Sequence, residues 1–100
     1  MQRKHDRVTI FTEIVLNSAS GNRDARISDL SAGGCFVDTI VTARVGEEVS
    51  LKMTLPPGDV IEVTGNVAYV FDGTGFGVSF TSLSDSARKS IEEFVASNTQ

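Results

Sequence analysis

The sequence has little of several residue types on which common protein chemistries depend. Its 100 residues contain one cysteine, one histidine, one tyrosine and no tryptophan. Cys35 has no partner for an internal disulfide, which favours a reducing compartment. His5 has no second histidine for a metal cluster, and no nucleophile–base pair accompanies it. We therefore predict that the chain is not an enzyme and that it uses no metal or cofactor.

Long hydrophobic runs are also absent. No apolar stretch approaches the roughly 20 residues that a bilayer-spanning helix needs, and the N-terminus is charged from Arg3 onward, unlike a signal peptide. We therefore expect no membrane insertion and a cytoplasmic location.

Basic side chains are few, with nine lysines and arginines against thirteen acidic residues and a net charge of −4. DNA and RNA binding needs many cationic contacts along the phosphates, so neither nucleic acid is an expected partner. A small nucleic-acid-binding barrel of the OB or cold-shock type would also need a basic groove with exposed aromatic side chains. The acidic composition disfavours a barrel of this type.

Three of the nine basic residues lie together at the N-terminus as Arg3, Lys4 and Arg7. With Asp6 they give residues 1–7 a net charge of +2, which leaves −6 for residues 8–100. We expect residues 1–7 to be a flexible arginine arm. A cationic arm on an acidic body can trap a small anion, because each guanidinium offers a planar fork of donors to a phosphate.

An alternating pattern of apolar and polar residues dominates the chain and predicts strands. The clearest example is 47–55, where Val49, Leu51, Met53 and Leu55 alternate with polar residues. In 60–71 the pattern places Tyr69 and Phe71 on the same face as Ile61, Val63 and Val67, and Gly65 suggests a bulge. Strands are predicted at 8–17, 23–30, 35–37, 47–55, 60–71 and 76–80.

After residue 82 the period becomes that of a helix, with Leu83, Ala87, Ile91 and Val95 on one stripe. Ser84 or Asp85 can cap its start. The predicted fold is a six-stranded antiparallel, Greek-key-like β-barrel with a C-terminal amphipathic helix at about residues 84–97. Residues 8–97 form the barrel domain in this prediction.

A second group of polar residues lies in the segment Asp29-Leu30-Ser31-Ala32-Gly33-Gly34. Asp29 and Ser31 project from one face if strand geometry persists. A carboxylate can accept two hydrogen bonds from a guanine edge, a hydroxyl can donate to a phosphate or accept from a base, and Gly34 allows close backbone approach. An Asx or serine turn between two strands explains the same residues without a ligand.

Together, Arg3-x-x-x-Arg7 and Asp29-x-Ser31-x-x-Gly34 resemble the two motifs of the PilZ domain family. The segments Gly-Asn-Val-Ala-Tyr at 65–69 and Gly-Phe-Gly-Val-Ser-Phe at 75–80 look like its late strands. The resemblance covers essentially the whole chain.

The resemblance implies a bacterial second-messenger receptor for cyclic di-GMP. Arg3 and Arg7 would contact phosphates and guanine, Asp29 and Ser31 would hold a guanine, and Gly34 would keep the turn open. Tyr69 and Lys4 are weaker candidates for the same site. Ligand would order the arm against the barrel and create a surface for a downstream protein partner. The alternative is a PilZ-like interaction domain with little or no nucleotide binding.

Overall fold

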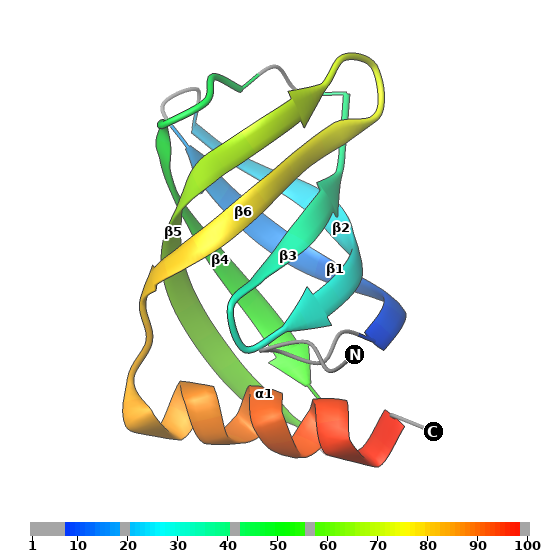
Figure 1. Cartoon of the computed structure of the whole chain (residues 1–100), viewed down its shortest axis with the longest axis vertical. Helices are drawn as coiled ribbons and strands as arrows, with labels where there is room; N and C mark the ends of the chain where they lie inside the picture. Colours follow the sequence, from blue (N-terminus) through cyan, green and yellow to red (C-terminus); the bar gives the residue numbers. More distant parts are fainter. Residues whose placement is uncertain (1–7, 19–20, 41–42, 56–57, 99–100) are drawn as a thin grey trace, which may run out of the picture.

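The computed structural model describes residues 8–18, 21–40, 43–55 and 58–98 of the chain. Every predicted strand and the predicted helix are present, with ends that differ by a few residues. The elements in Figure 1 are β1 (Val8–Ser18), β2 (Gly21–Ser31), β3 (Gly34–Asp38), β4 (Glu48–Leu55), β5 (Asp59–Phe71), β6 (Gly75–Ser82) and α1 (Asp85–Asn98).

The six strands close into an antiparallel barrel in the order β1-β2-β3-β6-β5-β4, and β4 pairs with β1 to complete the ring. Neighbours in sequence pair as hairpins except at β3 and β4, which the connection across the barrel end separates. Such a crossover is the Greek-key feature that the sequence predicts. The predicted fold class is therefore confirmed.

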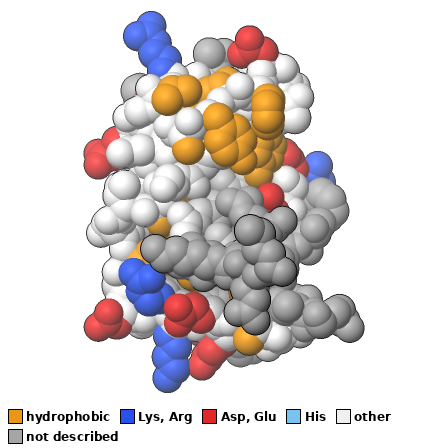
Figure 2. Space-filling model, viewed as in Figure 1, with side chains coloured by type: hydrophobic (Ala, Val, Ile, Leu, Met, Phe, Trp, Pro, Cys, Tyr) orange, Lys and Arg blue, Asp and Glu red, His pale blue; other side chains and the backbone are white. Residues whose placement is uncertain are grey.

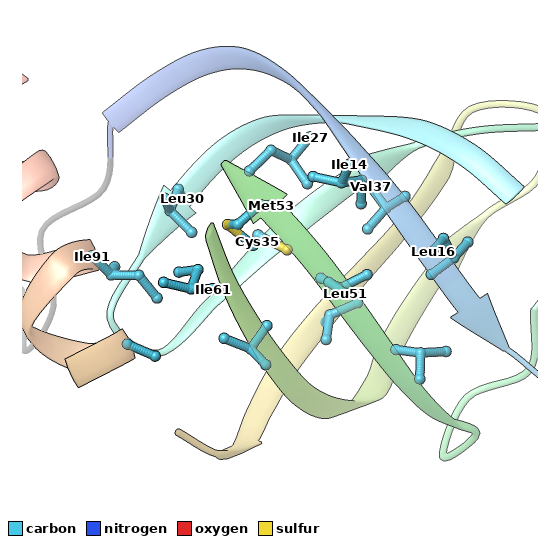
Figure 3. Packing of buried hydrophobic residues seen from close by; sticks show 14 of the residues in the cluster. Ile14, Leu16, Ile27, Leu30, Cys35, Val37, Leu51, Met53, Ile61 and Ile91 are labelled. Carbon is cyan, nitrogen blue, oxygen red and sulfur yellow. The ribbon is translucent and has the colours of Figure 1, made fainter. Parts of the chain in front are cut away.

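The strict alternation in β4 gives the predicted arrangement, with apolar side chains inside the barrel and polar side chains outside. Val49, Leu51, Met53 and Leu55 all point into the barrel and are each at most 1% exposed, while Lys52 on the same strand is exposed. Figure 3 shows how side chains from different strands meet in this interior, with Cys35 as one of the buried members. The buried Cys35, which forms no disulfide, therefore packs as a small hydrophobic group.

Three register shifts interrupt the alternation in the strands that carry the candidate site. In β2 the shift falls between Ile27 and Asp29, so Ile27 and Leu30 are both buried although their positions differ by three. The pairing of β5 and β6 also shifts next to Gly65, where Thr64 pairs with Ser82 and Gly65 with Phe80, so the extra residue lies on β6 and not at the glycine. A further shift in β5 lies between Val67 and Tyr69. Each such bulge changes which residues face the core.

The helix α1 lies across one end of the barrel (Figure 1), with Ala87, Ile91 and Val95 buried against the core. Ser84 is the cap, because its Oγ accepts a hydrogen bond from the Ala87 N–H at 3.1 Å. Among the described residues, no helix has the length and apolar character required to cross a bilayer. The helix leaves the outer barrel wall uncovered, and Tyr69 among the predicted site residues lies on that wall.

Candidate functional site: a hairpin and an aromatic face on the barrel wall

The segment that carries Asp29, Ser31 and Gly34 forms the tight hairpin between β2 and β3. Ser31 pairs with Gly34, which leaves a two-residue turn. Ser31 is 2% exposed; its Oγ accepts a hydrogen bond from the Gly33 N–H at 3.2 Å and donates one to the Gly34 carbonyl at 3.3 Å. The hydroxyl thus holds the turn together, and a ligand at this place would share or replace these bonds.

Asp29 faces outward from the barrel, because its neighbour Leu30 is fully buried in the core. Its register partners are Thr9 on β1 and Phe36 on β3. The bulge before Asp29 is what puts its carboxylate on the outer wall, since an unbroken alternation from buried Ile27 would turn Asp29 inward. Asp29 and Ser31 therefore flank the same inward Leu30.

Gly34 has a specific structural reason to be glycine. A Cβ at this position would collide with the carbonyl oxygen of Val78 on β6. The adjacent Gly33 carbonyl accepts a hydrogen bond from the Phe80 N–H at 2.9 Å, which ties the turn to the same strand. The missing side chain lets β6 approach the hairpin closely and so fixes the position of Ser31 and Asp29.

Tyr69 lies on the outside of the barrel, so the expectation that Tyr69 and Phe71 share the core face of β5 is wrong. The bulge at Ala68 reverses the alternation after Val67, which is 1% exposed, whereas Tyr69 and Phe71 are 42% and 58% exposed. Val70, between them, packs against the core instead. Core packing therefore does not explain Tyr69.

Tyr69, Phe71 and Phe36 form a cluster that we call the aromatic face. The Phe36 and Tyr69 rings stack with centroids 6.2 Å apart, and Phe71 lies 5.4 Å from Tyr69 and 6.1 Å from Phe36. The rings extend over β6, where a Cβ at Gly77 would collide with the Tyr69 ring. Figure 2 shows hydrophobic side chains gathered on the part of the wall away from α1.

A continuous row of register partners joins Asp29 to the aromatic face. The row crosses five strands, from β1 through β2, β3 and β6 to β5, and consists of Thr9, Asp29, Phe36, Gly77 and Tyr69. Phe36 is the member that the sequence reasoning missed. Its signal was present, because it alternates with the apolar Cys35 and Val37 in a strand whose inward positions they already fill.

The three basic candidates Arg3, Lys4 and Arg7 lie outside the described residues. The chain re-enters the description at Val8, which pairs with Leu30 and is therefore one position from the Thr9–Asp29 pair. Residues 8–100 carry a net charge of −6. The arm thus ends two residues before Thr9, the register partner of Asp29.

A groove of about 370 Å³ lies on the outer barrel, lined by Glu13, Ile14, Val15, Asp24, Lys52, Thr54 and Val60, and it shares no residue with the β2–β3 hairpin or the aromatic face. In the described ranges no group of His, Cys, Asp or Glu is placed to hold a metal ion.

Comparisons with known proteins agree with the fold. The family model for the PilZ domain matches residues 1–97. A search of curated protein sequences found no match. Among solved structures, the Bacillus subtilis inhibitor of motility MotI/DgrA superposes with a TM-score of 0.87 at 16% identity, over 97% of this chain and 51% of that one.

Two further structures hold c-di-GMP. The PilZ domain of Escherichia coli YcgR has a TM-score of 0.73 at 17% identity and covers 98% of this chain and 92% of that one. Borreliella burgdorferi PlzA has a TM-score of 0.74 at 16% identity and covers 94% of this chain and 41% of that one. This chain therefore spans about half or less of the MotI/DgrA and PlzA chains. At these identities the superpositions establish the fold alone. The match to the family model establishes that the chain belongs to the PilZ domain family.

Proposed function

Since the chain belongs to the PilZ domain family, we propose that it is a receptor for cyclic di-GMP, held between the arginine arm and the β2–β3 hairpin. PilZ domains typically bind this ligand and are typically non-catalytic receptor domains. The proposed site consists of Arg3, Arg7, Asp29, Ser31 and Gly34, with Tyr69 and Lys4 as additional candidates.

The observation that carries the proposal is the pairing at the start of β1. Val8 pairs with Leu30 and Thr9 pairs with Asp29, so the first described residue of the chain lies beside the motif carboxylate. Arg7 precedes Val8 directly, and an extended chain advances by at most about 3.6 Å per residue. This pairing supports the proposal that the two motifs, 22 positions apart from Arg7 to Asp29 in the sequence, act on one ligand.

The groups at this place suit the ligand's chemistry. The phosphates need cations, which the arm supplies through Arg3 and Arg7. The guanine edge offers N1–H and N2–H donors, for which the outward Asp29 carboxylate is an acceptor. The guanidinium planes can also stack on the bases. In this proposal the arm folds over the ligand and so tightens binding.

This requirement gives the proposed mechanism of signalling. Ligand orders the arm on the barrel wall, and the ordered arm together with the wall forms a new surface that a protein partner reads. The cost of ordering lowers the affinity but couples binding to a change of shape. A cytoplasmic setting belongs to this proposal and suits the buried Cys35, which forms no disulfide.

Calorimetric titration tests the proposal. Removing one arginine that grips a phosphate should weaken binding by about ten- to a hundredfold, so Arg3→Ala and Arg7→Ala should each show this loss. Arg88→Ala is the matched control, because Arg88 is an exposed arginine on α1. Wild-type affinity in both arm variants would overturn the clamp.

The base specificity is tested by a competing ligand. Cyclic di-AMP has the same phosphates and ribose rings but lacks the guanine N1–H and N2–H donors, so it should bind much more weakly if Asp29 reads the base. Equal affinity for the two dinucleotides would contradict the role of Asp29 and leave only a phosphate site.

The exposed aromatic face favours the second candidate, a PilZ-like interaction domain with little nucleotide affinity. Exposed aromatic clusters are common at protein interfaces. Calorimetry of the folded wild-type protein separates the two functions, because absence of a binding signal with cyclic di-GMP would favour the interaction domain.

A further inference from the structure

The aromatic face is bordered by carboxylates on its sides. A second row of register partners runs beside the first and links Arg26, Asp38, Gly75 and Phe71. Asp38 therefore stands next to the aromatic face on β3, as Asp29 does in the first row, and exposed Asp72 follows Phe71 at the hairpin tip. A surface of three rings with acidic neighbours suits a cation that can lie flat on a ring.

We propose that, in the ligand-free protein, the arginine arm itself occupies this surface, with the Arg3 guanidinium against the aromatic face. Charge complementarity supports this occupant, because the arm carries +2 and the remainder of the chain −6. Guanidinium groups stack on aromatic faces more readily than ammonium groups do. The contact is weak and exchanges rapidly, and bound ligand takes the arginine away from it.

The length of the arm allows the contact. Val8 starts β1, and β3 is the second strand from β1 in the barrel order, with β6 and β5 beyond it. Adjacent strands are about 4.8 Å apart, so β3 lies roughly 10 Å and β5 roughly 19 Å from β1 along the wall. The five peptide steps from Val8 to Arg3 reach up to about 18 Å before the side chain is counted.

The contact would also explain why Tyr69 and Phe71 are outside. The bulge at Ala68 turns two large rings from the core to the wall, where 42% and 58% of their surfaces remain exposed among the described residues. An intramolecular occupant has a high effective concentration, so even a weak contact is populated. In this proposal the arm binds the aromatic face whenever no ligand is bound.

The ligand-free contact is tested by NMR of the arginine Nε–H groups in the full chain, without nucleotide. A guanidinium above a ring should show an upfield Arg3 Nε–H signal, which Phe71→Leu combined with Tyr69→Leu should return to its ordinary position. Ile40→Ser is the matched control, because Ile40 is 88% exposed and outside the aromatic face. An Arg3 signal that these variants do not move would overturn the proposal.

A second test measures the affinity for cyclic di-GMP, which should rise in these variants, whereas the loss of a ligand contact would lower it. A cation–π contact at an exposed site favours the docked arm by a factor of about two to five, so abolishing it should raise the affinity for cyclic di-GMP about three- to sixfold, and removing one of the three rings should raise it by part of that factor. Phe71→Leu is the variant of choice, since Phe71 is not part of the proposed ligand site. Weaker binding in Phe71→Leu would overturn the competition and make the ring part of the ligand site.

The controls distinguish other occupants. Lys4→Gln removes the same charge as Arg3→Gln, so an equal effect of both on the aromatic ring signals would reduce the contact to nonspecific electrostatics and overturn it. Ring signals that shift with protein concentration would assign the face to a second copy of the chain instead. If cyclic di-GMP failed to bind, the proposed function would fall while the ligand-free signals would still decide the arm contact.

Discussion

The β2–β3 hairpin and the aromatic face lie on the same barrel wall, but their shapes have different origins. Backbone packing fixes the hairpin, where Gly34 lies against the Val78 carbonyl and the Ser31 hydroxyl bridges the turn. Side chains form the aromatic face, where Tyr69 fills the space above Gly77. A collision with backbone cannot be relieved locally, whereas an exposed ring can rotate away. The wall thus pairs a rigid frame with an adjustable surface.

Gly34→Ala, in the rigid hairpin, should lower the free energy of unfolding more than any other substitution considered. The new Cβ collides with a strand backbone inside a closed barrel, so β3 or β6 has to move, at a cost of about 3 kcal/mol or more. Urea denaturation measures the loss. In Gly21→Ala the new methyl meets no atom within 4 Å, and only the strain at φ +109° remains, which amounts to about 1–2 kcal/mol. Equal costs at the two glycines would contradict the close approach.

Ser31→Ala should have an intermediate effect. It removes the Oγ that bonds the Gly33 N–H and the Gly34 carbonyl in a nearly inaccessible position, which should lower the free energy of unfolding by about 1–2 kcal/mol. The comparison is Ser79→Ala on β6, an exposed serine for which a change within about 0.5 kcal/mol is expected. A neutral Ser31→Ala would mean that the hydroxyl serves only a ligand.

Gly77→Ala should have the smallest effect on stability and a clear effect on the aromatic face. Its Cβ meets the exposed Tyr69 ring, which can swing outward, so the expected cost is below about 1 kcal/mol. The ring should nevertheless leave Phe36, which nuclear Overhauser effects between the two rings measure. If Gly77→Ala destabilised the protein as much as Gly34→Ala, the aromatic face would be as rigid as the hairpin.

The barrel was predictable where the sequence pattern is regular. In β4 every second residue is apolar and every one of those is buried, so local pattern and burial agree. The same holds for the stripe Ala87, Ile91 and Val95 on α1, and Ser84 caps this helix as predicted. The family resemblance rested on motif spacing, and the match of the PilZ family model confirms it.

The prediction failed where a bulge interrupts the pattern. Counting by twos along 60–71 placed Tyr69 and Phe71 in the core, because one extra residue at Ala68 leaves no local signature in the apolar pattern. Its position is set by pairing with β6, a partner strand that a local pattern does not include. Phe36 was missed for a related reason. Its place in the aromatic face depends on contact with Tyr69, which lies two strands away in the barrel.

The sequence by itself determined the barrel, the capped helix and the membership in the family, because alternation, helical period and motif spacing are local properties of the chain. Only the tertiary structure decided that Asp29 stands beside the start of β1, that Gly34 accommodates the β6 backbone, and that Tyr69 faces outward. Each of these depends on the register between strands far apart in sequence. That register is fixed when the ring of strands closes around one shared core.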